Sequence, residues 1–342
     1  MALQARMLKF HDKIKLTLSE RENLQEKSDI LIDELRDCDD LPSFDPYDQG
    51  SYAIHLGVRP PDDSSEKSYR EYDVDVALRL KVNKDDEDPF TCKNTIKQAL
   101  NGHTKYGTQI KKPCVTVTYS HDGEPAYHVD LVAYAYENKD DDASQMYIAK
   151  GKTQENAQWE RADPVGLVNY ISDAICLFDD PDQFRRVVRY IKRWKSLKFS
   201  PDGHNEPPSI GLTLIALETF KVFKSDDLSA LLHVAREVDA RFVPTEVVEG
   251  EQHYKIECGM PPHLKFEPET NVFEKMNVKQ MTTFRKKLDS FIERLEAVQD
   301  EADEIEQCRI LHEIFGDDFE LPTKADAGRK QRTFIPRTSH SG

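Results

Sequence analysis

Three aspartates in apolar, strand-like segments are the side chains of this chain best suited to chemistry. Asp73 and Asp75 alternate with valines over residues 73–76, and Asp130 lies among apolar residues over 128–132. Side chains alternate between the two faces of a strand, so Asp73 and Asp75 point to the same face, where an aspartate from a neighbouring strand would join them. Clustered carboxylates repel one another unless cations bridge them, and hard oxygen ligands suit Mg²⁺ that carries a nucleoside triphosphate. The pattern therefore predicts a site for two Mg²⁺ ions, with Mn²⁺ as the alternative, that supports phosphoryl transfer.

The apolar surroundings of these aspartates distinguish them from the other acidic residues. The chain has 63 acidic residues, so Asp-x-Asp pairs are expected by chance, mostly on solvated strand edges. Val74, Val76 and Leu131, by contrast, are core-type residues, which predicts buried strands. A buried carboxylate without a partner costs on the order of several kcal/mol, and a shared cation would remove that cost for all three aspartates.

Gln49, Gly50 and Ser51 supply a second feature, a turn able to hold phosphate. The prolines and glycine that follow Leu41 predict a turn into a strand and then a helix. Glycine lets the backbone approach a phosphate closely, and the start of a helix offers free N–H groups and the positive end of the helix dipole. An ordinary turn stays the alternative for so short a motif.

The composition limits the class of protein. A chain of 342 residues with 38% hydrophobic and 32% charged residues predicts a globular, bilobed molecule. The formal net charge of −16 argues against a protein that binds nucleic acid over its whole surface, because such binding needs a basic field. Lys9, Lys13 and Lys15 interrupt the apolar residues of the amino terminus, and no later stretch is long and apolar enough to span a bilayer. We expect a cytoplasmic protein with no membrane partner.

The cysteines do not predict a metal site. The six cysteines stand singly, with no Cys-x-x-Cys pair and no histidine at ligand spacing. Structural zinc is therefore not expected. We interpret the cysteines as small buried hydrophobic residues in a reducing compartment.

Hydrophobic patterning predicts an α+β fold with three parts. Residues 1–160 would form N-terminal helices and a small mixed sheet, 161–322 a helical lobe, and 323–342 a disordered basic tail. For the first part we expect one or two helices over 3–36 with a Ser19–Glu22 capping box, a strand over 72–82, a helix over 92–100, and a hairpin of strands 114–119 and 127–134. For the second we expect helices over 164–177, 181–198, 209–223, 226–242 and 278–315, with 245–273 as loop and one short strand.

The order of these motifs resembles the DNA polymerase β-like nucleotidyltransferase superfamily, in which a glycine-serine turn precedes an Asp-x-Asp strand and a third acidic residue. The longer spacing over residues 52–72 resembles that of the bacterial relatives of cyclic GMP-AMP synthase. Further segments resemble the helical lobe of the cGAS/DncV-like nucleotidyltransferases (CD-NTases) of CBASS anti-phage defence: Trp159 with 163–164, then 189–195, then 207–212. The resemblance covers roughly residues 49–321.

The resemblance implies roles for the site residues in a cleft between the sheet and the helical lobe. Asp73 and Asp75 would bind both metals, and Asp130 the catalytic metal while it helps to activate the attacking ribose hydroxyl. The turn at 49–51 would hold the donor triphosphate, with Ser51 on its phosphates. Among helical-lobe positions, the resemblance matches Lys192 to a lysine that neutralises triphosphate and Ser209 to a serine that contacts phosphate at a helix start. A solvated lysine on a helix face stays the alternative for Lys192.

The implied activity is synthesis of a cyclic di- or trinucleotide second messenger from nucleoside triphosphates. ATP is the expected substrate, with GTP or a pyrimidine triphosphate beside it. A linear oligonucleotide synthase or RNA-end nucleotidyltransferase of the same superfamily, and a non-catalytic scaffold, stay open. No zinc ribbon is present and the chain is acidic, so we expect no DNA activator.

Two further interpretations concern the base and the carboxyl terminus. Side chains near Lys111, Lys112, Cys114, Asn156 and Gln158 are candidates for reading the nucleobase. The basic tail ends in Ser341 and Gly342, which resembles the tails that ubiquitin-like conjugation partners in some anti-phage operons join to targets. An unstructured solubilising end is the alternative.

Overall fold

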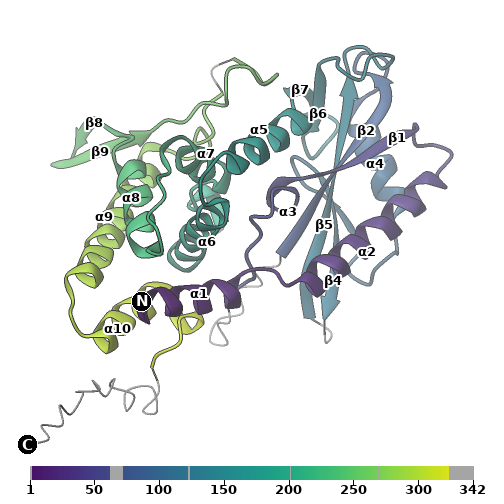
Figure 1. Cartoon of the computed structure of the whole chain (residues 1–342). Helices are drawn as coiled ribbons and strands as arrows, with labels where there is room; N and C mark the ends of the chain where they lie inside the picture. The colour runs from purple at the N-terminus through teal and green to yellow at the C-terminus, as the bar shows by residue number, and fades with distance from the viewer. Residues whose placement is uncertain (1, 62–71, 122–123, 201, 269, 323–342) are drawn as a thin grey trace, which may run out of the picture.

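The computed structural model describes residues 2–61, 72–121, 124–200, 202–268 and 270–322. A mixed β-sheet lies beside a group of helices (Figure 1). The α+β fold predicted from the sequence is confirmed. The tail from residue 323 lies outside the described residues, so its predicted disorder stays a prediction, as do the domain bounds.

The sheet has seven strands in the order β1-β2-β5-β4-β3, with β6 pairing to β5 and β7 to β6. Strands β2 and β5 are parallel, and the other neighbours are antiparallel, including the predicted hairpin of β4 and β5. The strands are β1 (Phe44–Gln49), β2 (Tyr72–Asn83), β3 (Thr108–Ile110), β4 (Val115–His121), β5 (Glu124–Tyr136), β6 (Met146–Lys150) and β7 (Gln158–Ala162). The strand predicted after Leu41 is β1, whereas sequence analysis missed β3, β6 and β7, which are short and lack a clean alternation of apolar and polar residues.

One face of the sheet carries a large core, and the other carries the aspartates beside a smaller apolar cluster that includes Ala77, Val132 and Tyr134. Val74, Val76 and Leu78 of β2 are fully buried in a cluster with residues of α2 (Leu18–Arg36) and α4 (Pro89–Ala99). Figure 1 shows α2 and α4 along this side of the sheet. Because side chains alternate along a strand, the odd-numbered positions of β2 point to the opposite face, toward the helical region.

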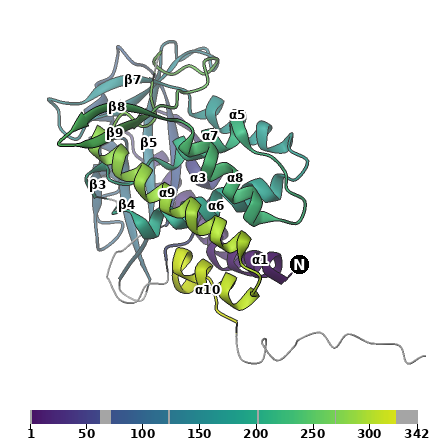
Figure 2. The same cartoon turned by 90° about the vertical axis from the view of Figure 1, so that its left-hand side faces the viewer.

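The helical region is built around a second core. Its elements are α1 (Ala2–Ile14), α5 (Pro164–Cys176), α6 (Pro181–Lys198), α7 (Ser209–Thr219), α8 (Asp227–Asp239), α9 (Val278–Asp300) and α10 (Glu304–Phe315), with short helices η1 (Asp202–His204) and η2 (Gly316–Asp318). Met7 and Phe10 of α1 belong to this core although α1 begins the chain. Figure 2 shows α1 beside α10, with α9 crossing the helical region.

Several predicted element ends are wrong, each for a local reason. The amino-terminal segment forms two helices, and the capping box joins Thr17 and Glu20 rather than Ser19 and Glu22, because Ser19 already lies inside α2. The predicted helix 278–315 divides into α9 and α10, since the Asp303 side chain accepts the Ile305 amide and starts a new helix.

Other predicted elements are shorter or of another type. The predicted helices 209–223 and 226–242 end at Thr219 and Asp239. The predicted loop 245–273 contains most of a hairpin of β8 (Phe242–Val248) and β9 (Glu251–Ile256). Sequence analysis missed the hairpin because β8 is almost wholly exposed and shows no alternation.

The cysteines agree only in part with their predicted burial. Cys92, Cys114, Cys258 and Cys308 are buried, but Cys38 is half-buried and Cys176 is exposed at the end of α5. The sequence alone does not show whether a cysteine near the end of a helix faces the core or the solvent. In the part of the chain that the structure describes, no helix combines the length and apolar character needed to cross a membrane.

Candidate active site

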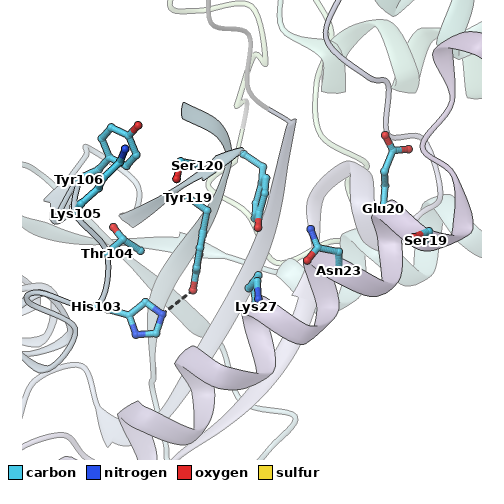
Figure 3. A pocket seen from close by; sticks show the side chains of 11 residues that line it. Ser19, Glu20, Asn23, Lys27, His103, Thr104, Lys105, Tyr106, Tyr119 and Ser120 are labelled. Atoms are coloured by element: carbon cyan, nitrogen blue, oxygen red, sulfur yellow. Dashed lines mark hydrogen bonds between the residues drawn. The ribbon is translucent and has the colours of Figure 1, made fainter. Parts of the chain in front are cut away.

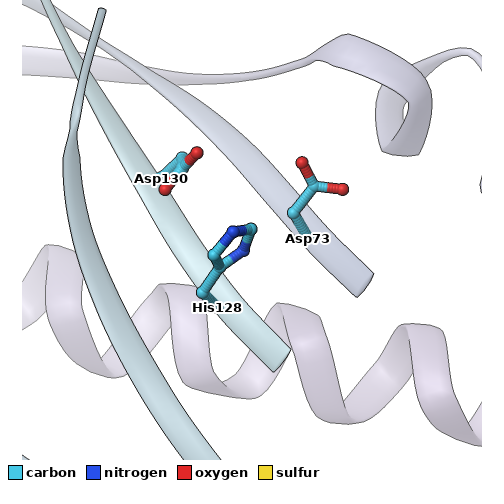
Figure 4. A group of neighbouring side chains, drawn as sticks. All are labelled: Asp73, His128 and Asp130. Carbon is cyan, nitrogen blue, oxygen red and sulfur yellow. The ribbon is translucent and has the colours of Figure 1, made fainter. Parts of the chain in front are cut away.

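The pairing of β2 with β5 brings the acidic residues together. In the parallel register Asp75 lies opposite Asp130, and Asp73 lies opposite His128. All four positions share one face of the sheet because each strand contributes residues two apart. One ligand atom each of Asp73, His128 and Asp130 lies within 4.8 Å of the others, and Figure 4 shows their side chains gathered on the same side of the two strands.

His128 is the member of this group that sequence analysis missed as a site residue. The sequence contains a pattern that could have indicated it, because His128 and Asp130 have the same spacing as Asp73 and Asp75. The spacing alone does not reveal which residues of two strands lie opposite one another. That information comes from the register.

Asp75 points toward the glycine-serine turn. A Cβ atom added at Gly50 would lie 2.1 Å from Asp75 Oδ2, and Gly50 has a positive φ of 64°. The turn therefore requires glycine for its conformation and for the approach of the carboxylate. Burial raises the pKa of Asp75 well above its usual range, and the charges of Asp73 and Asp130 add to the effect. Lys192 and Lys111 oppose it without cancelling it.

Asp130 is oriented by a side chain of the neighbouring strand. Thr116 lies opposite Asp130 in the antiparallel register, and its hydroxyl donates to Asp130 Oδ1 at 2.5 Å. The thiol of Cys114 lies 3.6 Å from the same hydroxyl, and burial, followed by the charge of Asp130, raises the pKa of Cys114 to about 12. Cys114 is therefore a neutral neighbour of the site and not a thiolate.

The turn at the end of β1 lies directly beside the carboxylates. Gln49 is opposite Asp75 in the register, and Tyr134 donates its hydroxyl hydrogen bond to Gln49 Oε1 at 3.0 Å. The helix that follows, α3 (Gly50–Ala53), has four residues. One turn of helix aligns few peptide dipoles, so the dipole part of the sequence prediction is wrong. Gly50 and Ser51 instead present a close backbone and one hydroxyl to the site.

Lys192 and Ser209 come from the helical region to the opposite wall. Lys192 of α6 donates to the Leu56 carbonyl at 2.8 Å, and burial lowers its pKa to about 8 while Lys195 adds to the lowering. The charges of Asp73 and Asp75 act in the other direction. Ser209 is the first residue of α7, as the sequence predicted for a serine at a helix start.

A cavity of about 850 Å³ joins these groups. Asp73, Asp75 and His128 line it from the sheet, and Ser51, Lys192 and Ser209 line it from the other side. Its volume lies in the range of about 300–1,000 Å³ that is usual for small-molecule sites. The cavity is large enough for a nucleotide and places carboxylates and a lysine around it.

The side chains suggested for base reading differ in their placement. Lys111 lines the cavity. Asn156 accepts hydrogen bonds from the amides of Lys152 and Thr153, and Gln158 donates to Glu160. Both amide side chains are thus engaged in local structure.

A second cavity, of about 1,030 Å³, lies on the face of the sheet that carries α2. Figure 3 shows its lining, with α2 on one side and the segment His103–Tyr106 on the other. His103 makes contacts of 2.6 Å with Glu34 and 2.9 Å with the Tyr119 hydroxyl. Within the described residues, this lining holds no carboxylate cluster like that of the first cavity, which is therefore the candidate active site.

The donor set fits divalent cations. Carboxylate oxygens suit Mg²⁺ and Mn²⁺, and imidazole nitrogen suits first-row transition ions. Burial, and after it the negative charges of Asp73 and Asp130, raise the pKa of Asp75, and Lys192 and Lys111 act in the other direction. A bound cation would add positive charge beside these carboxylates.

Comparisons with known proteins agree with this geometry. Residues 45–134, which contain the turn and the three aspartates, match the family model "Cyclic GMP-AMP synthase DncV-like, nucleotidyltransferase domain". The chain is 23% identical over 205 residues to a cyclic GMP-AMP synthase of Escherichia albertii, with 57% of this chain and 42% of that protein covered. It is 24% identical over 200 residues to a c-di-GMP synthase of Roseivirga ehrenbergii, with coverages of 51% and 48%. The matches thus span less than half the length of these curated relatives.

Solved structures share the fold over nearly the whole chain. The CD-NTase CdnG of Bradyrhizobium diazoefficiens, solved with GTP, superposes with a TM-score of 0.67 at 16% identity over 93% of this chain and 96% of that one. The apo form of Vibrio cholerae DncV gives a TM-score of 0.69 at 16% identity over 90% and 92%. Residues 45–134 thus match the DncV-like nucleotidyltransferase domain, and the chain shares its fold with the CD-NTase structures, in agreement with the resemblance of its sequence.

Proposed function

We propose that this protein joins nucleoside triphosphates into a cyclic di- or trinucleotide. One observation carries the proposal: Asp73, Asp75 and His128 line one cavity together with Ser51 and Lys192. Asp130 is grouped with Asp73 and His128, and Gly50 lies against Asp75. The names of the two curated relatives, a cyclic GMP-AMP synthase and a c-di-GMP synthase, support it.

Asp73, Asp75 and Asp130 would hold two divalent cations, Mg²⁺ or Mn²⁺. When bound, these ions supply electrostatic stabilisation of the charge on the transferring phosphoryl group. Thr116 holds Asp130 in place through its hydroxyl, so this carboxylate does not need to reorganise during the reaction.

Ser51 and Lys192 would bind the donor triphosphate. Lys192 has a pKa lowered to about 8, so at neutral pH most of its amines carry a proton, and a nearby polyanion favours that charged form further. Its contact with the Leu56 carbonyl holds the amine against the loop that follows Ser51. Ser209, across the cavity, adds a second hydroxyl for phosphate. We propose ATP as one substrate and GTP or a pyrimidine triphosphate as the other.

In the reaction, a ribose hydroxyl of the acceptor attacks the α-phosphorus of the donor. A bond forms between the hydroxyl oxygen and phosphorus, the bond from phosphorus to the pyrophosphate oxygen breaks, and pyrophosphate leaves. Asp130 lies beside the site of attack and helps to remove the hydroxyl proton. The linear product then turns in the cavity so that a second attack of the same kind closes the ring.

The test is synthesis with purified protein. Each α-labelled nucleoside triphosphate, alone and in pairwise mixtures with Mg²⁺ or Mn²⁺, is incubated with the enzyme, and the products are resolved by mass spectrometry after phosphatase treatment. A product that resists phosphatase and has lost all pyrophosphate supports the proposal. A phosphatase-sensitive chain indicates the linear synthase instead, and no pyrophosphate release from any mixture indicates a scaffold.

We further propose that the product is a second messenger in anti-phage signalling. The resemblance to the CBASS enzymes supports this role. Bacteria that carry the gene in its native genomic context would resist phage infection, and the same bacteria with Asp73→Asn and Asp75→Asn would not. Equal plaque counts for the two strains would rule the role out.

A further inference from the structure

His128 lies among the carboxylates of the candidate active site. One of its ring nitrogens is within 4.8 Å of a carboxylate oxygen of Asp73 and of Asp130. Figure 4 shows the ring between the two aspartates, and His128 lines the cavity. Its neighbours Tyr127 and Val129 are buried on the other face of the sheet, so the strand fixes the imidazole on the face that carries the aspartates.

One ring nitrogen of the imidazole lacks a hydrogen-bond partner. Nδ1 of His128 is buried and has no hydrogen-bond partner among the residues that the structure describes. A buried polar atom without a partner costs free energy, and native proteins satisfy nearly all such atoms. A ligand in the cluster would supply the missing partner, because Asp73 lies opposite His128 in the register and faces the same cavity.

We infer that His128 is a metal ligand that acts together with Asp73 and Asp130. This inference rests on the proposed function and refines its metal site. The register gives the cluster two unlike rows: Asp75 with Asp130 offers oxygen alone, and Asp73 with His128 offers oxygen and nitrogen. Oxygen ligands suit Mg²⁺, whereas an imidazole shifts a site toward Mn²⁺ and later first-row ions.

The consequence is a metal preference that an all-carboxylate site would not have. The site of Asp73, His128 and Asp130 binds Mn²⁺ more tightly than Mg²⁺, and Asp75, which shares Asp130 with that site, accepts Mg²⁺ with the nucleotide. Loss of the imidazole removes the preference but leaves three carboxylates for Mg²⁺.

Pulsed electron paramagnetic resonance of bound Mn²⁺ tests the inference without any turnover. The full-length protein is loaded with Mn²⁺ and a non-hydrolysable ATP analogue, and the electron spin echo is examined for coupling to nitrogen. A directly bound imidazole gives nitrogen modulation that changes when the histidines are labelled with ¹⁵N. The modulation is lost in His128→Gln and kept in His253→Gln, a half-buried histidine on β9 in the helical region.

Metal affinity gives a second readout. Removal of one of the ligands weakens Mn²⁺ binding by about 10-fold or more, and Mg²⁺ binding changes less than about 3-fold. Isothermal titration of the wild type, His128→Gln and His253→Gln with each ion measures the ratio. Equal losses for Mn²⁺ and Mg²⁺ in His128→Gln would overturn the inference.

The outcomes separate this inference from the proposed function. Wild-type protein that binds Mn²⁺ and makes product, but shows no nitrogen modulation, refutes the role of His128 and leaves the synthase intact. Wild-type protein that binds neither ion refutes the proposed function as well. If His128→Gln does not fold, the wild-type modulation with ¹⁵N-histidine still decides, and His128→Asn serves as the second variant.

Discussion

Two buried carboxylates of this protein have pKa values shifted in opposite directions: that of Asp227 is lowered and that of Asp75 is raised. In the helical region Asp227 is fully buried, and Arg186 donates to it at 2.6 and 3.0 Å. Gln183 and Tyr190 each donate to it at 3.1 Å. Burial alone would raise the pKa of Asp227, but the hydrogen bonds from Arg186 and Gln183 outweigh it and lower the pKa.

In the cluster of aspartates on the sheet, the pKa shift has the opposite direction. Asp75 is surrounded by Asp73 and Asp130, and its pKa rises well above the usual range because of burial and these like charges. Lys192 approaches but donates to the Leu56 carbonyl. The chain thus neutralises a buried carboxylate with its own residues where the role is structural. It leaves like charges together at the cluster that we propose as a cation site.

The largest effect is expected from changes to the cluster of Asp73, Asp75 and Asp130. Replacing Asp73 and Asp75 by Asn lowers the rate of pyrophosphate release by more than about 10³-fold, because several kcal/mol of charge stabilisation is lost. The variant folds normally, since two mutually repelling charges have been removed. Pyrophosphate release and circular dichroism check the two statements, and wild-type turnover in the variant would refute the assigned site.

A change to Asp227, whose charge Arg186 neutralises, should lower stability and leave turnover unchanged. Asp227→Ala leaves Arg186, within the described residues, with only its 3.8 Å contact to Asp180 and lowers the free energy of unfolding by about 3–5 kcal/mol. Urea denaturation measures the loss. Turnover per folded molecule at low temperature stays near the wild-type value, and a large drop in that value with unchanged stability would contradict the comparison.

The stabilisation by added metal should also differ between the two acidic groups. A cation that binds the folded protein alone at 100 times its dissociation constant stabilises it by about 2.7 kcal/mol. Thermal unfolding with saturating Mn²⁺ should show this increase for the wild type and for Asp227→Asn. The Asp73→Asn, Asp75→Asn double variant should show almost none, and an equal increase there would place the metal elsewhere.

The pH dependence of stability should differ in sign between the two groups. The raised pKa of Asp75 means that its folded form binds a proton more readily than its unfolded form, so its contribution is present below pH ~3.9 and is lost as pH rises through the folded pKa. The lowered pKa of Asp227 contributes above pH ~3.9 and is lost as pH falls. Urea titrations of chelator-treated wild type, Asp75→Asn and Asp227→Asn against pH resolve the two contributions, and slopes of the same sign would contradict the comparison.

The smallest expected effect concerns the orientation of Asp130. Thr116→Val keeps the shape of the side chain and removes the hydroxyl that donates to Asp130 Oδ1. We expect a decrease in the maximal rate of about 10-fold, since one hydrogen bond to a charged group contributes about 1.5–3 kcal/mol. Thr116→Ser, which keeps the hydroxyl, is the matched control. Equal effects of the two variants would show that the Thr116 hydroxyl has no special role.

The sequence by itself determined the features that depend on local periodicity and local capping. Asp73 and Asp75 share a face because strand side chains alternate, whatever the strand pairs with. Asp163, Asp180 and Asp226 start α5, α6 and α8 close to the predicted positions, because each side chain accepts an amide hydrogen bond three residues later. The turn at Gly50 was visible from composition, although the short length of α3 was not.

Only the tertiary structure decided which groups meet. The parallel register of β2 and β5 placed His128 opposite Asp73, and the packing of α6 brought Lys192 to the same cavity from a distant part of the chain. The exposed hairpin β8–β9 and the placement of α1 in the helical core also escaped the sequence patterns. Strand register and helix packing are set by burial against distant segments, which no local pattern contains.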